Sequence, residues 1–335
     1  MGVYHISGLG KSPGALTMPL SIVYILQAGA QLGIKEAQDF FAGSGESERK
    51  GSYEKTRGMP EYVIVFDSPE VIDGKVIDDK FKLLYKSNWF DMKSKNRPEP
   101  IKEPIVRYIN KLIGYLEDRF SVDLRPPKKL YLVRTDYQSF EDAFYKMGVT
   151  LEGLRRKEVW LNLIGGSNQM NLALLLAGAY TMVPSRYYYV FQSNAKMMEP
   201  SWIEKPSTEY ELRKVVRDLI LRWYDLPPLD LGFGTILREL ATLFIKGNRE
   251  RISKNELIDI FKKKNRGYDE TFIPKLLGTR YLVSVEDNMF QKGEMLDRIL
   301  EMFSRIAGTK VKNSSAWKKW ADEKGILEEA DFGEV

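Results

Sequence analysis

The segment that decides the fold is Val159-Trp-Leu-Asn-Leu-Ile-Gly-Gly-Ser-Asn-Gln-Met-Asn171, followed by the small-residue run 172–180. Its apolar first part predicts a buried strand, the two glycines predict a tight turn, and the remainder predicts a helix that begins directly after the turn. The first N–H groups of a helix have no intrahelical partner, and the helix dipole is positive at this end. Such a turn therefore suits a phosphate.

A second strand–glycine–helix turn opens the chain. The apolar strand Val3-Tyr-His-Ile6 precedes the stretch Ser7-Gly-Leu-Gly-Lys-Ser-Pro-Gly-Ala15. Two such turns in one sheet suit a ligand that carries several phosphates. The candidate binding residues in the two turns are Gly8, Gly10, Lys11, Ser12, Gly14, Gly165, Gly166, Ser167, Asn168, Gln169 and Met170.

Apolar runs typical of strands alternate with helical patterns along the first 200 residues, as a parallel α/β sheet requires. The strand candidates are 3–6, 62–66, 129–133, 160–164 and 187–191. The segments with helical periodicity between them are 16–32, 104–120, 138–147 and 170–182. The predicted fold class is therefore α/β with a mostly parallel sheet.

The pattern changes near Pro200, where strand-like runs give way to helices. The later helical segments are 207–224, 233–246, 254–263, 271–277 and 294–307, and a short hairpin is predicted over 280–291. Three helices followed by a hairpin are typical of a winged helix-turn-helix. We therefore predict two domains, 1–200 and 201–335, the second ending in a surface helix and an acidic tail from Trp317 onward.

Composition excludes several kinds of chemistry. The chain of 335 residues has no cysteine and one histidine, which leaves no disulfide, no thiolate nucleophile and no histidine-rich metal site, so no cofactor is expected. The first residues lack the charged and apolar regions of a signal peptide. The most apolar window, 159–183, is interrupted by glycines and amides, so it is not a membrane span. A cytoplasmic location is the expectation.

The two glycine turns and the winged-helix layout together resemble a known family. Ile6-Ser-Gly-Leu-Gly-Lys-Ser-Pro-Gly14, the turn Asn162-Leu-Ile-Gly-Gly-Ser-Asn-Gln-Met170 and the C-terminal layout are similar to CRISPR-associated Rossmann-fold (CARF) proteins. The resemblance is to the archaeal ring nucleases that join a CARF domain to a winged helix, and it covers residues 1–305. It implies a Rossmann-like sheet in the first domain.

The resemblance also implies a function. Two CARF domains would form a homodimer with a two-fold cleft for cyclic oligoadenylate, most simply cyclic tetra-adenylate, whose symmetry matches an isologous dimer. Ring nucleases of this kind open the ring without metal: a ribose 2′-hydroxyl attacks the neighbouring phosphate and leaves a 2′,3′-cyclic phosphate. The enzyme supplies alignment and charge stabilisation, and the reaction lowers the type III CRISPR antiviral signal.

Carried over by position, the resemblance gives Ser12 the role of the serine at the phosphate. The second turn departs from the family, which commonly has lysine or arginine where this chain has Asn168. Loss of one charge-stabilising group from a transition state costs about 3–4 kcal/mol, so cleavage is expected to be slow or absent unless another cation acts. The candidates for that cation are Lys11, Arg134, Arg155 and Arg156.

Each of these residues also has a purely structural interpretation. Gly165 and Gly166 suit a tight turn that brings the helix close to the sheet, and Ser12 and Asn168 suit helix caps. His5 lies in an alternating strand and is more often a core residue than a catalyst. The tyrosines 187–189 are expected to line the sheet, with one of them a candidate to stack on adenine.

A nucleoside triphosphatase is one alternative, because Gly10-Lys11-Ser12 matches the end of a P-loop and 62–67 matches a strand with a magnesium-binding aspartate. A full P-loop, however, requires glycine where His5 stands, and Pro13 directly follows Ser12.

A DNA-binding regulator controlled by the same ligand is the other alternative. Segment 246–266 holds eight Lys or Arg against three acidic residues, but the chain from 201 on has 24 basic and 23 acidic residues. Because DNA binders usually carry a strong positive field, we rank the second domain first as a dimerisation and lid element. The absence of any histidine after residue 5 argues against a ribonuclease effector with an arginine–histidine pair.

Overall fold

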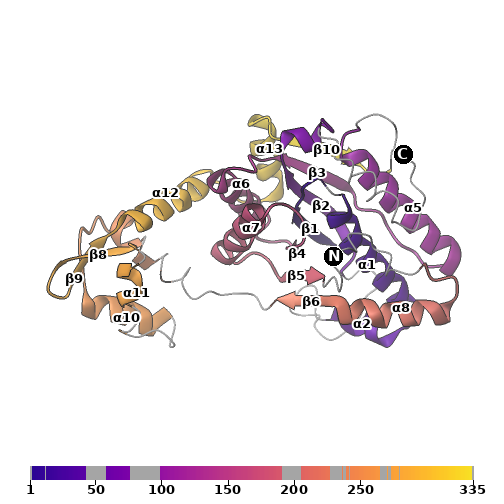
Figure 1. Ribbon diagram of the computed structural model, residues 1–335, viewed down its shortest axis with the longest axis horizontal. Coiled ribbons are helices and arrows are strands. Elements are labelled where there is room, and N and C mark those ends of the chain that lie inside the picture. The colour runs from indigo at the N-terminus through magenta and orange to yellow at the C-terminus, as the bar shows by residue number, and fades with distance from the viewer. Residues whose placement is uncertain are drawn as a thin grey trace. The chain divides into compact units, whose positions relative to one another are not determined.

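The computed structural model describes residues 2–11, 13–42, 58–75, 99–190, 205–226 and, farther on, 236, 239–240, 242–264, 270, 273–278 and 280–333 (Figure 1). The chain forms two compact units. The first comprises Met1–Gly178, Val183–Pro228 and Lys312–Val335, and the second comprises Ala179–Met182 and Leu229–Val311.

A seven-stranded sheet of order β10-β3-β2-β1-β4-β5-β6 forms the centre of the first unit (Figure 1). Its strands are β1 (Val3–Gly8), β2 (Pro60–Asp67), β3 (Lys129–Arg134), β4 (Val159–Asn162), β5 (Arg186–Val190), β6 (Trp223–Leu226) and β10 (Leu327–Asp331). The five inner strands run parallel, and the two edge strands pair antiparallel. The predicted α/β class with a mostly parallel sheet is thus confirmed.

Helices cover both faces of this sheet (Figure 1). One face carries α1 (Gly14–Gln31), α2 (Lys35–Ala42), α5 (Lys102–Phe120) and α8 (Glu209–Arg222). The other carries α6 (Phe140–Gly153), α7 (Asn168–Thr181) and α13 (Ser314–Glu323), and the short α3 (Pro69–Ile72) follows β2. Every residue of α1 from Leu16 to Ala30 is buried, as expected for a helix that is apolar on all sides and packs between other helices and the sheet.

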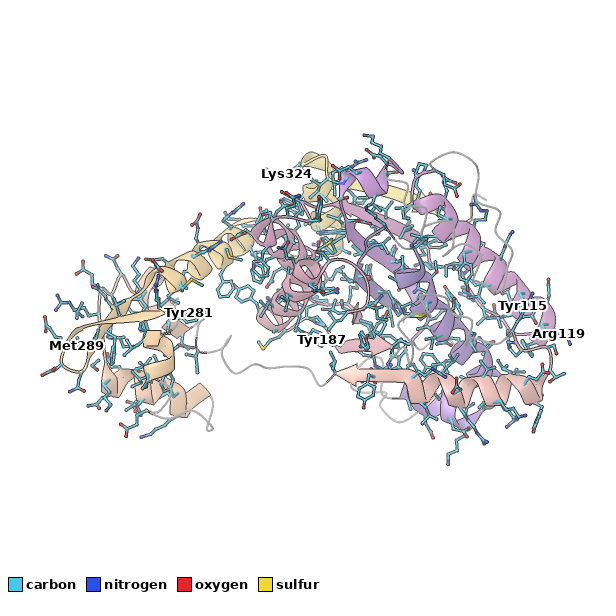
Figure 2. All side chains as sticks on the ribbon, in the orientation of Figure 1. Tyr115, Arg119, Tyr187, Tyr281, Met289 and Lys324 are labelled. Atoms are coloured by element: carbon cyan, nitrogen blue, oxygen red, sulfur yellow. The ribbon has the colours of Figure 1, made fainter. Side chains whose placement is uncertain are left out.

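Side-chain hydrogen bonds fix the start of α8. Tyr115 and Arg119, near the end of α5 (Figure 2), donate to the backbone carbonyls of Pro206 and Ser207. The hydroxyl of Thr208 then accepts the N–H of Glu211, which caps α8. These hydrogen bonds join the segment that starts at residue 205 to α5 of the first unit.

The units do not follow the boundary predicted at residue 200. Segment 205–226 belongs to the first unit, because α8 packs on α1 and β6 pairs with β5. The end of the chain also returns to this unit, since β10 pairs with β3 and Trp317 is 1% exposed. The predicted helix is present as α13 (Ser314–Glu323), but the prediction of an acidic tail was wrong, because Glu328 and Glu329 lie within a strand of the sheet.

The second unit has its own apolar core, which includes Ile236, Leu257, Phe261, Leu276 and Leu296. Its elements are the π-helix η2 (Thr242–Lys246), β7 (Ile252–Ser253), α10 (Lys254–Lys264), α11 (Ile273–Gly278), β8 (Leu282–Glu286), β9 (Met289–Lys292) and α12 (Glu294–Gly308). The strands form an antiparallel sheet of order β7-β9-β8. The hairpin predicted near 280–291 is confirmed as β8–β9.

Among the described helices, none taken alone has the length and apolarity of a membrane span. In the described part of the chain, α1 and α2 reach those values when taken together, and the two are bent by 115° at the break between them.

Candidate functional site

The two glycine turns lie side by side in the first unit. Strands β1 and β4 are parallel neighbours, with Ser7 opposite Asn162, so the turns that follow them occupy the same edge of the sheet. From β1 the chain continues to β2 on one side, and from β4 it continues to β5 on the other. In an open α/β sheet, this divergence creates a crevice at the carboxyl ends of the two strands, where ligands bind.

Backbone contact between the turns explains three of the glycines. A Cβ atom on Gly165 would lie 2.2 Å from the carbonyl oxygen of Gly8, and one on Gly8 would lie 3.0 Å from the carbonyl oxygen of Gly165. Gly166 has φ +88°, a conformation that disfavours any side chain. The glycines therefore serve the packing of one turn on the other, a role that the sequence did not indicate.

Asn162, the last residue of β4, joins the two turns. Its side chain is 1% exposed, and its Nδ2 donates to the hydroxyl of Ser7 at 3.1 Å and to the carbonyl of Ala15 at 3.0 Å. Its Oδ1 accepts the N–H of Ile164 at 2.9 Å. This one amide therefore holds β1, the start of α1 and the second turn together.

Pro19 explains why the carbonyl of Ala15 accepts a side-chain donor. Proline inside α1 has no N–H, so the carbonyl four residues earlier lacks its usual helical partner. Asn162 takes the place of that partner. Sequence reasoning missed this arrangement, and its signals were an amide in an apolar strand and a proline inside a helical pattern.

The second turn ends in a capped helix. The hydroxyl of Ser167 accepts the N–H of Met170 at 3.2 Å, so Ser167, and not Asn168, is the capping residue of α7. Asn168 and Gln169 are exposed in the first turn of the helix, and Met170 is buried. The two exposed amides are thus available to a ligand at this helix end.

The first turn leads into α1 through Pro13, which makes no side-chain cap. Lys11 is exposed, and a Cβ atom on Gly10 would meet open space. Ser12 lies outside the described residues. His5, where a P-loop requires its first glycine, is the third residue of β1, which continues to Gly8, so no loop begins at His5.

Two of the four candidate cations lie at the edge of the sheet that carries the glycine turns, and two lie at the opposite edge. Lys11 lies in the first turn, and Arg134 ends β3 on the same edge of the sheet, where it pairs with Asp73 at 2.6 Å and Glu328 at 3.2 Å. Arg155 and Arg156 precede β4, so they lie at its amino end, opposite the glycine turns. The expectation that these two arginines contribute to the site is therefore corrected.

Asp67 adds a buried acid to this edge of the sheet. It follows Phe66, which pairs with Gly8, and its side chain accepts the N–H of Ser68 through Oδ1 at 2.7 Å. Its Oδ2 has no hydrogen-bond partner among the described residues. Burial raises the pKa of Asp67 to about 8.

The single histidine belongs to the core. His5 is 1% exposed and its Nδ1 lies 3.2 Å from the hydroxyl of Tyr188. Burial, with a contribution from the charge of Arg186, lowers the pKa of His5 to about 3. Arg186 itself lies over the rings of Phe40 and Trp160, 4.6 Å and 4.4 Å from their centroids. His5 is therefore neutral and away from the turns.

Several basic residues of the second unit are ion-paired. Arg249 pairs with Glu256 at 2.5 Å, Arg251 with Glu286 at 2.7 Å and Lys254 with Glu270 at 3.0 Å. Such exposed pairs add little stability, but they offset the positive charge that DNA binding requires. In the described part of 246–266, Lys262 and Lys263 are exposed on α10.

Comparison with known proteins identifies a relative over the full length of the chain. No model of a known protein family matches the sequence. A solved structure of Enterococcus italicus Csm6 bound to cyclic hexa-2'-fluoro-hexa-dAMP aligns with 82% of this chain at 12% identity and a TM-score of 0.35, and the alignment spans about half of that chain, 53%. An uncharacterized protein of Archaeoglobus fulgidus is 43% identical over 335 residues, 100% of this chain and 99% of that protein. The chain belongs to the same family as this Archaeoglobus fulgidus protein.

Proposed function

We propose that this protein binds cyclic oligoadenylate, in the first place cyclic tetra-adenylate, at the paired glycine turns of a homodimer. The observation that carries the proposal is the contact of the turns after β1 and β4 at the point where the chain connections diverge. Two helix starts, α1 and α7, lie at this point, and their N–H groups suit the phosphates of one ligand. In a two-fold symmetric dimer, each of these helix starts would occur twice, and this symmetry would match that of cyclic tetra-adenylate.

The proposed reaction is metal-independent opening of the ring. A ribose 2′-hydroxyl gives up its proton to water as its oxygen forms a bond to the adjacent phosphorus, the bond from phosphorus to the 5′-oxygen breaks, and the leaving 5′-oxygen takes up a proton from water. The products are a 2′,3′-cyclic phosphate and a 5′-hydroxyl. Helix N–H groups, the amides of Asn168 and Gln169 and the ammonium group of Lys11 would stabilise the charge on the phosphate, while Ser12 would position the attacking hydroxyl.

Incubation of the protein with labelled cyclic tri-, tetra- and hexa-adenylate in EDTA tests this reaction. Linear products with 2′,3′-cyclic phosphate ends are expected from the tetra-adenylate, and the rate should fall at least 100-fold in Ser12→Ala, in line with loss of one transition-state donor. Arg156→Ala is the matched control, because this residue precedes β4 at the opposite end, and it should cleave normally. Undiminished cleavage by Ser12→Ala would remove Ser12 from the mechanism.

A non-cleaving sensor is the second candidate. The observation in its favour is that the second turn presents only neutral amides, Asn168 and Gln169, and that Arg155 and Arg156 lie at the other end of β4. Saturable binding of the ring without product over many hours would favour the sensor. In that case, Asn168→Lys should introduce measurable cleavage.

A further inference from the structure

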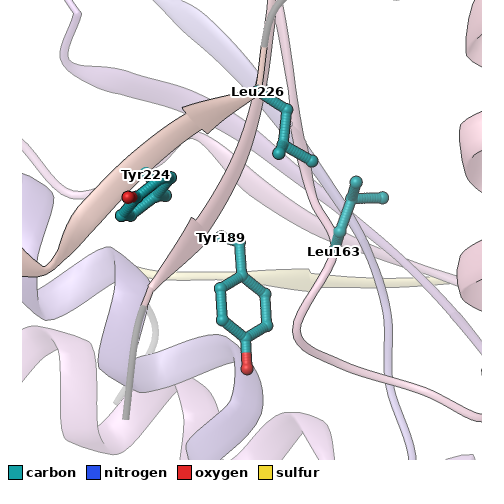
Figure 3. A pocket seen from close by; sticks show the side chains of 4 residues that line it. All are labelled: Leu163, Tyr189, Tyr224 and Leu226. Atoms are coloured by element: carbon teal, nitrogen blue, oxygen red, sulfur yellow. The ribbon is translucent and has the colours of Figure 1, made fainter. Parts of the chain in front are cut away.

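An apolar pocket adjoins the second glycine turn (Figure 3). Leu163, Tyr189, Tyr224 and Leu226 line it, and its volume is about 470 Å³. This volume is within the range of small-molecule sites, which are concave and mostly apolar. All four residues belong to the first unit.

The two tyrosines lie on one face of the sheet and line the same surface. Tyr189 of β5 and Tyr224 of β6 are direct cross-strand partners, so their side chains project from the same face of the sheet with Cβ atoms about 5 Å apart. Tyr189 is 40% exposed and Tyr224 is 61% exposed. Exposed aromatic side chains that line one pocket on a sheet are typical of a binding surface.

Leu163 connects this surface to the phosphate-binding turn. It directly follows β4, its N–H donates to the carbonyl of Tyr188 at 3.1 Å, and it precedes Gly165 by two residues. Two residues span at most about 7 Å, which is close to the distance between the base and the phosphate of one nucleotide. A nucleotide with its phosphate at the turn is therefore long enough to place its base in the pocket.

We propose that this pocket is the subsite for the purine base of the nucleotide whose phosphate lies at the second turn. The inference rests on the proposed function and deepens it by assigning the part of the ring that Tyr189 and Tyr224 contact. Stacking on these rings is the main interaction, since none of the four lining side chains carries a charge. The loss of one stacked base corresponds to about a 5- to 150-fold weaker Kd.

The test compares adenosine 5′-monophosphate with ribose 5-phosphate, which has the same sugar and phosphate but no base, by titration calorimetry. The wild-type protein should bind the nucleotide at least 5-fold more tightly. Tyr189→Ala and Tyr224→Ala should lose this preference, and Tyr189→Phe should keep it because the ring is retained. Tyr210→Ala is the matched control, since Tyr210 is 67% exposed on α8 and outside the pocket.

Equal affinity of the wild-type protein for the two compounds would overturn the subsite, and this result needs no variant. An undiminished preference in both alanine variants would also overturn it. Dissociation of a wild-type dimer into monomers in Tyr189→Ala, seen by light scattering, would identify the pocket as a subunit contact and overturn it as well.

A parallel titration with cyclic tetra-adenylate separates the two proposals. Binding of the ring without a base preference for the mononucleotide contradicts the subsite and leaves the proposed function standing. A base preference that follows Tyr189 and Tyr224, with no binding of any ring, supports the subsite and contradicts the proposed function.

Discussion

At the scale of single residues, Asn162 explains how the two turns keep their positions. Its side chain is buried, and both the Nδ2 and the Oδ1 of its amide have hydrogen-bond partners. A buried amide with all its partners defines one arrangement, because any other would leave a polar group without a hydrogen bond.

A double-mutant cycle tests the coupling of Asn162 to Pro19. Asn162→Ala should lower the free energy of unfolding by about 1–3 kcal/mol, the cost of unpaired buried groups. In the background of Pro19→Ala, an N–H at position 19 can serve the carbonyl of Ala15, so the cost should fall by about 1 kcal/mol. Guanidinium unfolding gives the four values, with exposed Gln169→Ala as a control. Equal costs in both backgrounds would contradict the coupling.

Asp67 gives the folded protein a pH dependence with a definite sign. The pKa of its carboxyl group is raised by burial from 3.8 to about 8, so the folded state retains a proton that the unfolded state releases near pH 4. The stability from this group is complete below pH 4 and is lost as the pH rises to about 8, by at most about 1.4 kcal/mol per pH unit. Asp67→Asn, measured by guanidinium unfolding between pH 4 and 8, should lack this decline. The same slope in wild type and variant would refute the assignment.

At the level of helices and strands, the sequence predicts the first strands of the sheet and the two glycine turns well. The strands 3–8, 60–67 and 129–134 and the two glycine turns lie close to their predicted positions, because long apolar runs bounded by glycine or polar residues have few alternatives. The order of strands and helices also determines which end of a strand a residue occupies. Arg155 and Arg156 come before β4, so they lie at its amino end, even though they are close in sequence to the second turn.

Strands β6 and β10 could not be predicted from the sequence, because each forms only through pairing with a neighbouring strand that is distant in sequence. Leu327-Glu-Glu-Ala-Asp331 is acidic and weak in β-propensity, but it pairs with β3, and Lys129 and Lys318 form ion pairs with Glu329. Trp223-Tyr-Asp-Leu226 continues the apolar period of α8 in sequence and becomes a strand only beside β5. Nothing local in either segment distinguishes it from a tail or a helix end.

The contact between the turns predicts a sharp difference between two glycine substitutions. Gly165→Ala places a methyl group against the backbone of Gly8 and should destabilise the fold by about 1–3 kcal/mol. Gly114→Ala, in the middle of α5 with open space at the Cβ position, should stabilise it by up to about 1 kcal/mol. Thermal unfolding measures both. Equal melting temperatures for the two variants would contradict the packing of the turns.

Two substitutions in α13, one at a buried and one at an exposed position, should differ strongly in their effect on stability. Trp317 of α13 is buried, donates to the hydroxyl of Thr150 at 2.8 Å and packs edge-on against Tyr131. Trp317→Ala should therefore cost about 3–5 kcal/mol. Lys319→Ala, on an exposed position of the same helix, should change stability by less than about 0.5 kcal/mol. A small effect of Trp317→Ala in denaturant unfolding would mean that α13 is not part of this core.

At the scale of the whole molecule, most of the second unit is inserted in the sequence between two edge strands of the first unit, β6 and β10. The chain leaves the sheet after β6 and returns through α13 to β10, and these strands are at opposite ends of the strand order. A boundary placed by composition at residue 200 could not reveal this return, because only strand pairing assigns 327–331 to the sheet. The winged-helix assignment of the second unit, and its role as a lid or DNA reader, stay predictions.

The proposed function requires that the two glycine turns of each chain hold one cyclic tetra-adenylate across a dimer. Titration calorimetry of cyclic tetra-adenylate into the wild-type protein, Gly165→Ala and Arg156→Ala measures this binding. Saturable binding with one ring per two chains is expected for the wild type, at least 100-fold weaker in Gly165→Ala and unchanged in Arg156→Ala. No binding of the tri-, tetra- or hexa-adenylate ring, or undiminished binding by a folded Gly165→Ala variant, would contradict it.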